Sequence, residues 1–303
     1  MMTVTQEGFS GGITCELLDN WTRTPSRAAV EGLTVLPQNV IRNWGINPGP
    51  KAADVQLLMA GRQALHERED VRRVSARLFP RNLPQLTSLA YAAVCVEAHD
   101  AGGDFYDFFD RGQHRIGFAI GDVSGRGMAS ALVRAALQAS LRTACTLGGD
   151  DFQESLALVN RLLFERTPEP MYATLFFAGY DEETRRLRYV NCGHPAPLLY
   201  RHDKVLQLDT TSQVLGLFSD WKGSIGEVRL RPGDTLLAYT DGITEATDDA
   251  GEEFGEGKLL AMLEAQSGPL SAFLRQCVEE VRRFGASEQR DDLTLMALRV
   301  LEV

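Results

Sequence analysis

The order of strand-type and helix-type segments limits the fold of this chain more than any other sequence feature. Strand-type segments are short apolar runs rich in β-branched and aromatic residues, whereas helix-type segments repeat their apolar residues every three or four positions. The strand-type segments are 89–96, 105–109, 116–123, 173–180, 187–191, 198–200, 226–230, 235–240 and 293–301, and the helix-type segments are 128–145, 152–166, 256–266 and 270–284. Because the strands occur in runs with helical pairs set between them, the pattern predicts an α+β layered sandwich rather than a parallel sheet with alternating helices.

The N-terminal part of the chain departs from this pattern and suggests a division into three parts. Residues 1–50 contain scattered Gly, Pro, Thr and Asn with little periodicity, so we expect an irregular N-terminal arm there. Residues 51–79 favour a helical linker, because several apolar residues fall roughly on one helical face and Pro80 ends the segment. A helix packed on its own domain is the favoured interpretation, and a dimerising helix is the alternative. Residues 80–303 form the third part, which we expect to be a single domain.

Composition and charge exclude several classes of protein. The 303 residues are 44% hydrophobic and 24% charged, with no apolar run long enough to span a bilayer and no signal peptide at the start. We therefore expect a cytoplasmic protein with no membrane partner. Five widely spaced cysteines without a C-x-x-C pair indicate neither a disulfide framework nor a zinc site. The formal net charge of −10 would repel a nucleic-acid backbone, so we expect no nucleic-acid partner.

Four acidic segments share one local pattern, in which an Asp lies next to an apolar strand or beside glycines. They are Gly102-Gly103-Asp104, Gly121-Asp122-Val123-Ser124-Gly125, Thr240-Asp241-Gly242 and Arg290-Asp291-Asp292-Leu293. Hard cations such as Mg²⁺ and Mn²⁺ prefer carboxylate oxygens held by rigid elements, and a neighbouring glycine lets the backbone approach an ion. One Asp-Gly pair alone is typical of a turn. All four together predict a shared metal site, with the backbone carbonyl of Val123 as a further ligand.

These segments lie within a longer ordered series of motifs that resembles a known family. The motifs are Ala101-Gly-Gly-Asp-Phe-Tyr-Asp107, Gly121-Asp-Val-Ser-Gly-Arg-Gly-Met-Ala-Ser-Ala-Leu132, Asn191-Cys-Gly-His-Pro-Ala-Pro-Leu-Leu199, Leu215-Gly-Leu217, Tyr239-Thr-Asp-Gly-Ile-Thr-Glu-Ala246 and Arg290-Asp-Asp-Leu-Thr-Leu295. The series resembles the PPM family of metal-dependent protein phosphatases, and specifically its bacterial SpoIIE-type branch of sporulation and stress-response phosphatases. The resemblance covers about residues 75–303. It implies a four-layer αββα sandwich of two antiparallel sheets flanked by helices.

The resemblance also implies a binuclear centre with two divalent cations, Mn²⁺ or Mg²⁺. The metal-binding residues that it implies are Asp104, Asp122, the carbonyl of Val123, Asp241 and Asp291, with Asp292 as a neighbouring candidate. Two cations about 3.5–4 Å apart can activate a water for attack on phosphorus, so no protein nucleophile is required. The implied reaction is hydrolysis of phosphoserine or phosphothreonine on a protein substrate, which in this branch is an anti-sigma-factor antagonist.

Arg126 stands where animal members of the family place a histidine that is proposed as a general acid. An arginine keeps its proton, so we expect Arg126 to stabilise phosphate charge instead. The alternative function is a catalytically silent signalling or docking module of the same fold. We favour the enzyme, because converging carboxylates without cations would repel one another and cost stability. A regulatory partner or a second copy of the chain is expected to engage the N-terminal helix.

Overall fold

The structure, a computed structural model, describes residues 2–6, 14–17, 52–81, 83–112, 114–147, 151–167, 170–285 and 289–302. Residues 1–17 and 72–303 belong to one compact unit, and residues 18–71 belong to another. All the site residues predicted from the sequence lie in the first unit.

A seven-stranded sheet forms one half of a sandwich, with the strand order β2-β1-β3-β12-β11-β8-β9. Its strands are β1 (Met2–Gln6), β2 (Thr14–Leu17), β3 (Leu89–Val96), β8 (Leu198–Arg201), β9 (Lys204–Gln207), β11 (Thr235–Tyr239) and β12 (Leu293–Val300). β3 and β12 pair antiparallel over their full lengths, from Leu293 opposite Val96 to Val300 opposite Leu89. The segment before Asp104 and the segment that contains Asp291 are therefore brought to one edge of the sandwich.

The sequence of β3 shows why this strand is buried on both faces. Successive side chains of a strand point to opposite faces. The side chains of Leu89, Tyr91, Ala93 and Cys95 pack into the core between the sheets, and those of Ala90, Ala92, Val94 and Val96 pack into a second core under helices. A strand that is apolar at every position thus fits only an inner layer.

A five-stranded sheet forms the other half, with the order β10-β7-β6-β5-β4. Its strands are β4 (Phe105–Asp110), β5 (Arg115–Val123), β6 (Ala173–Asp181), β7 (Arg186–Cys192) and β10 (Gly226–Arg229). Aromatic side chains join the two sheets, since the ring of Phe108 in β4 lies 4.7 Å from that of Tyr91 in β3, centroid to centroid.

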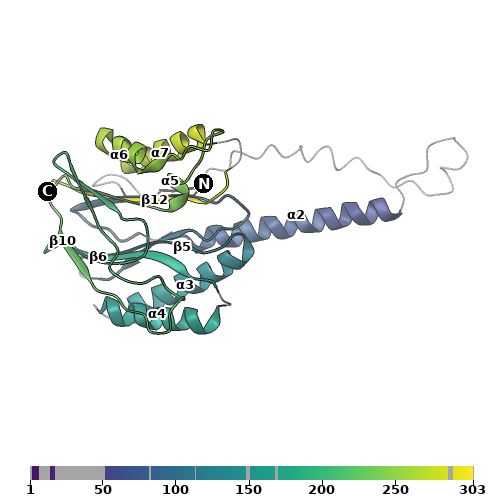
Figure 1. Ribbon diagram of the computed structural model, residues 1–303, viewed down its shortest axis with the longest axis horizontal. Helices are drawn as coiled ribbons and strands as arrows, with labels where there is room; N and C mark the ends of the chain where they lie inside the picture. Colours follow the sequence, from purple (N-terminus) through teal and green to yellow (C-terminus); the bar gives the residue numbers. More distant parts are fainter. Residues whose placement is uncertain are drawn as a thin grey trace, which may run out of the picture. The chain divides into compact units, whose positions relative to one another are not determined.

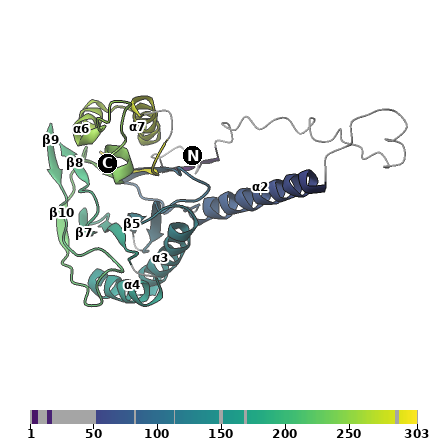
Figure 2. The same cartoon turned by 45° about the vertical axis from the view of Figure 1, so that its right-hand side comes forward.

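Helices cover the outer faces of both sheets (Figure 1, Figure 2). α3 (Met128–Leu147) and α4 (Phe152–Arg166) share a core with the five-stranded sheet, and α6 (Gly255–Ala265) and α7 (Leu270–Phe284) share one with the seven-stranded sheet. A short helix, α5 (Asp241–Thr244), follows β11 directly. The four-layer α+β sandwich of two antiparallel sheets is confirmed.

The expectation of an irregular arm over residues 1–50 is wrong at two places. Residues 2–6 and 14–17 form β1 and β2, which extend the seven-stranded sheet because β1 pairs with the backbone of β3. The pairing partner lies far away in the sequence, so local periodicity carries no signal of it. The rest of the predicted arm lies outside the described residues.

The predicted linker helix is present as α2 (Ala52–Leu78). Among the described apolar residues of its predicted face, Val71 and Leu78 are half-buried, whereas Leu65 and Val74 are both 60% exposed. Ser75 is 4% exposed, so polar contacts of Ser75 also hold the last turn of the helix.

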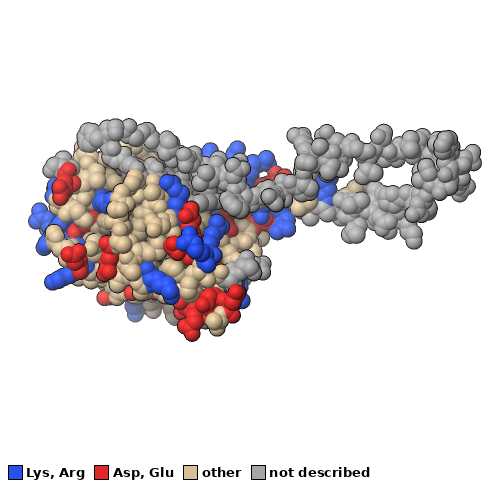
Figure 3. All heavy atoms as spheres, turned by 90° about the horizontal axis from the view of Figure 1, so that it is seen from above, with Lys and Arg blue, Asp and Glu red and all other residues tan. Residues whose placement is uncertain are grey.

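Charged side chains of both signs are interspersed over the face of the molecule seen from above in Figure 1 (Figure 3). None of the described helices is long and apolar enough to cross a bilayer.

Candidate active site

The predicted acidic residues all lie at strand ends on one edge of the sandwich. Asp104 directly precedes β4, and Asp122 is the last residue but one of β5, which pairs with β4 through Phe105 opposite Gly121. Asp241 directly follows Thr240 after β11. Asp291 and Asp292 directly precede β12, which is paired with β11. The two sheets thus each contribute carboxylates to the same region.

Asp104 is buried within this group, and Asp122 is half-buried. Asp104 is 2% exposed, and its pKa is raised well above the usual range by burial, by the charge of Asp122 and by that of Asp292. The pKa of Asp122 is raised to about 7 by burial and by repulsion from Asp241 and Asp291. These mutual effects show that carboxyl groups from all four acidic segments lie close together.

Asp241, Asp291 and Arg126 form the more open side of the site. Burial and the charge of Asp291 raise the pKa of Asp241. The side chain of Asp291 is 51% exposed, and its Oδ2 lies 3.5 Å from Nη2 of Arg126, which is itself 64% exposed. Arg126 therefore reaches the rim of the carboxylate group without being buried in it.

Asp292 has a different environment from the other four acids. Its Oδ1 accepts a hydrogen bond from the backbone N–H of Ala98 (2.8 Å), and its Oδ2 accepts one from the N–H of Asp104 (3.3 Å). A Cβ atom at position 102 would lie 1.6 Å from Oδ2 of Asp292, so only glycine allows this approach. Asp292 thus ties the start of β12 to the loop that carries Asp104.

Gly103 allows a second close approach, to the end of β5. A Cβ atom at position 103 would lie 2.4 Å from the carbonyl oxygen of Val123 and 2.8 Å from Oδ1 of Asp122. The Val123 carbonyl is consequently beside the Asp122 carboxyl group, as a further oxygen ligand would have to be.

The donor chemistry fits hard divalent cations, because the converging groups offer only oxygen atoms. Burial and mutual repulsion raise the pKa values of Asp104, Asp122 and Asp241, so positive charge among them would be favourable. Within the described part of the chain, no three acidic, histidine or cysteine side chains already stand around one point as a cation site requires. Ligation would therefore require the carboxylates to turn toward a common centre.

Two threonines were not among the predicted site residues. The hydroxyl groups of Thr240 and Thr294 donate hydrogen bonds to Oδ2 of Asp104, at 2.7 and 2.6 Å. Both threonines lie within two residues of a predicted acid, which is the sequence signal that would have indicated them.

A buried arginine is a second omission from the sequence prediction. Arg134 of α3 is fully buried, and its Nη1 donates to Oε1 of Glu97 (2.8 Å) and to the backbone carbonyl of Asp104 (2.9 Å). Its Nη2 donates to Oγ of Ser75 in the last turn of α2 (2.6 Å), and that hydroxyl group contacts Glu97. Arg134 thus links α2, α3 and the Asp104 loop.

His194 plays no part in the acidic group, in agreement with the preference of hard cations for oxygen. It is buried, its Nδ1 lies 2.9 Å from the hydroxyl group of Thr174, and burial lowers its pKa to about 3. The ring is therefore neutral at physiological pH.

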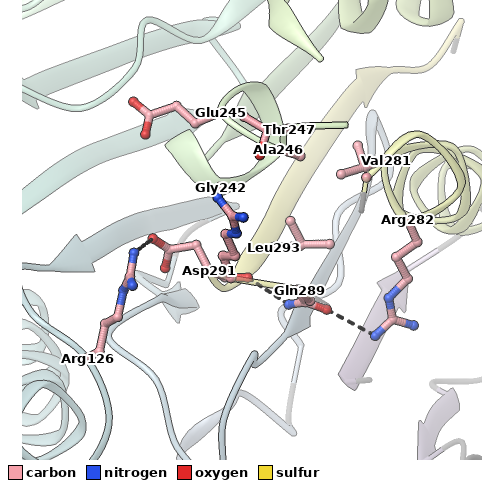
Figure 4. A pocket seen from close by; sticks show the side chains of 12 residues that line it. Arg126, Gly242, Glu245, Ala246, Thr247, Val281, Arg282, Gln289, Asp291 and Leu293 are labelled. Atoms are coloured by element: carbon pink, nitrogen blue, oxygen red, sulfur yellow. Dashed lines mark hydrogen bonds and ion pairs between the residues drawn. The ribbon is translucent and has the colours of Figure 1, made fainter. Parts of the chain in front are cut away.

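A pocket of about 450 Å³ adjoins the open side of the site (Figure 4). Gly242, Arg290, Asp291 and Leu293 belong to both the acidic segments and the pocket wall. The other lining residues are Arg126 after β5, Glu245, Ala246 and Thr247 after α5, Val281, Arg282 and Gly285 at the end of α7, and Gln289.

Comparisons with known proteins agree with this geometry. Residues 112–301 match the family described as "Stage II sporulation protein E (SpoIIE)". The chain is 27% identical over 260 residues to Protein IcfG of Synechocystis sp., covering 77% of this chain and 41% of that protein. It is 26% identical over 230 residues to phosphoserine phosphatase RsbU of Bacillus subtilis, covering 75% of this chain and 68% of RsbU. The chain thus spans less than half of the length of IcfG.

The fold is also similar to solved structures. The SiaA-PP2C domain of Pseudomonas aeruginosa superposes with a TM-score of 0.69 at 20% identity, covering 79% of this chain and 98% of that domain. At this identity the similarity shows a shared PP2C fold. Since the family match covers more than half of the 303 residues and runs through β5, β11 and β12, the chain belongs to the stage II sporulation protein E (SpoIIE) family.

Proposed function

We propose that this chain is a metal-dependent protein-serine/threonine phosphatase. The observation that carries the proposal is the meeting of carboxyl groups from four separate segments at one edge of the sandwich, where burial and the neighbouring charges raise the pKa values of Asp104, Asp122 and Asp241. In a protein of this fold that served only as a docking module, the repulsion among the carboxylates would lower stability and would have no function.

In this proposal Asp104, Asp122, Asp241 and Asp291, with the carbonyl of Val123, hold two divalent cations, Mn²⁺ or Mg²⁺. When bound, such a pair supplies Lewis acidity toward the phosphoryl group and a nucleophilic water. The hydroxyl groups of Thr240 and Thr294 orient Asp104. Asp292 acts as a positioning residue, because both of its carboxylate oxygens already accept backbone hydrogen bonds.

We assign Arg126 to the substrate phosphate. Its guanidinium group is mostly exposed, and among the residues that the structure describes its one ion-pair partner is Asp291 at 3.5 Å, so it is able to turn toward an anion at the rim. A guanidinium group forms two parallel hydrogen bonds to phosphate oxygens and keeps its proton throughout. Arg126 would therefore stabilise charge rather than protonate the leaving oxygen.

The substrate class follows from relatives. RsbU is named a phosphoserine phosphatase, and we propose phosphoserine or phosphothreonine on a protein for this chain. An anti-sigma-factor antagonist is the substrate that the motif resemblance favours. A cytoplasmic location and a regulatory partner or second copy that engages α2 remain predictions.

Manganese-dependent hydrolysis of p-nitrophenyl phosphate tests the proposed function. Asp122→Asn and Asp241→Asn should each lower the rate by at least about a hundredfold, because each removes a carboxylate that balances cation charge. Isothermal titration should show weakened Mn²⁺ binding in both variants. Asp203→Asn is the matched control, since this exposed Asp lies in the β8–β9 turn at a positive φ that Asn also adopts. Undiminished hydrolysis in EDTA would contradict the proposal.

A further inference from the structure

Three arginines line the pocket beside Asp291. Arg126 follows β5, Arg282 belongs to the last turn of α7, and Arg290 precedes β12. Such a concentration of positive charge stands out in a chain whose formal net charge is −10. The three side chains come from separate segments. The tertiary fold therefore brings these positive charges together, because they do not lie in one basic stretch of the sequence.

The positive charges of the pocket are poorly compensated. Nη2 of Arg282 donates to Oε1 of Gln289 (3.2 Å), which is a neutral amide oxygen. The Arg290 side chain forms no hydrogen bond or ion pair with any residue that the structure describes. The carboxylate of Glu245, which also lines the pocket, extends away from Arg282 (Figure 4). At least two guanidinium groups are thus available to an incoming anion.

The pocket is fixed to the carboxylate group through Gln289. Nε2 of Gln289 donates to the backbone carbonyls of Val96 and Asp291, both at 2.8 Å, while its Oε1 accepts from Arg282. A ligand in the pocket would consequently lie at a set position relative to Asp291. The pocket therefore adjoins the candidate metal site and is not separate from it.

The walls of the pocket indicate the kind of anion that it takes. Ala246, Val281 and Leu293 contribute apolar atoms, which suit the methylene groups of a side chain, and the arginines suit a carboxylate. Resting on the proposed function, we propose that this pocket binds an acidic side chain, Glu or Asp, that lies close to the phosphorylated residue of the protein substrate. Arg282 and Arg290 are then specificity-determining residues.

Short phosphoserine peptides whose flanking residues are Glu, Ala or Lys test this subsite. By fluorescence anisotropy in Mn²⁺, the wild-type protein should bind the Glu-flanked peptide about fivefold more tightly than the Lys-flanked one, as expected for a partly exposed ion pair. Arg282→Glu should reverse the order of the two peptides, and Arg290→Ala should reduce the preference. Arg283→Ala is the matched control, because Arg283 is the next residue of α7, pairs with Glu280 and does not line the pocket.

The binding readout separates this inference from the proposed function. Equal affinity of the wild-type protein for the three peptides, or an unchanged preference in correctly folded Arg282→Glu, would overturn the subsite even if all peptides were hydrolysed. Retained selectivity without hydrolysis of any peptide would support the subsite and reject the phosphatase. Thermal unfolding of each variant checks that Arg282→Glu folds, and Arg290→Ala provides a second test if it does not.

Discussion

At the scale of single residues, glycine decides how closely the acidic segments approach. A Cβ atom at position 102 would meet the carboxylate of Asp292, and one at position 242 would lie 2.0 Å from the Asp292 carbonyl oxygen. Gly242 directly follows Asp241, and Gly102 lies two residues before Asp104, so both belong to the sequence pattern of glycine near a predicted ligand. The structure adds that both glycines lie against atoms of Asp292.

Gly102→Ala should destabilise the protein by about 2–3 kcal/mol, because the buried Asp292 carboxylate must give up its position to admit the methyl group. The free energy of unfolding in urea measures the effect. Gly257→Ala within α6 is the control, since nothing lies within 4 Å of the added atom. Alanine favours a helix over glycine, so this variant should gain about 0.5–1 kcal/mol. Equal stability of the two variants would refute the close-approach argument.

At the scale of elements, α3 is fastened to the site by a charged residue within its buried face. Arg134 donates to Glu97 and to the backbone of Asp104, and Ser75 receives its third hydrogen bond. Three elements therefore share one guanidinium group. A buried charge of this kind is costly unless all its partners are present, which makes the connection specific.

Arg134→Met should lower the free energy of unfolding by about 3–5 kcal/mol, because Glu97 is left without its buried partner. Arg161→Met, on the exposed face of α4, should change it by less than about 0.5 kcal/mol. Urea unfolding followed by circular dichroism compares the two variants. A loss confined to Arg134→Met supports the link, whereas similar small losses would show that Arg134 is not needed to hold the elements together.

At the scale of the whole molecule, stability depends on a carboxyl group held between a sheet and a helix. Asp107 of β4 is fully buried and pairs with Arg142 of α3. Burial raises the pKa of Asp107 to about 7, although the charge of Arg142 opposes the shift. In the unfolded chain an Asp has a pKa of about 3.9. The folded state therefore binds more protons between these values, and stability falls as the pH rises from about 4 to 7.

Asp107→Asn should remove this part of the pH dependence. From about pH 5 to pH 7.5, the wild-type protein should lose about 2 kcal/mol more stability than the variant, and the difference should level off above the folded pKa. Chemical unfolding at several pH values, in EDTA for both proteins, gives the comparison. The acids of the candidate metal site are common to both proteins and cancel. Parallel pH profiles would show that Asp107 titrates normally.

The sequence alone determined the layer pattern and indicated which acidic segments form the candidate site. Strand and helix periodicities, and the pattern of Asp beside Gly, are local, so they were readable at β3, at α4 and at the segments of Asp104, Asp122, Asp241 and Asp291. Only the tertiary structure decided which strands neighbour one another, including the pairing of β1 with β3. It also decided that Asp292 accepts hydrogen bonds from the backbone N–H groups of Ala98 and Asp104. The burial of Arg134 and the common pocket of Arg282 and Arg290 likewise came from the tertiary structure. These features join residues that are distant along the chain. Tertiary packing determines which residues become partners, and local sequence patterns do not predict it.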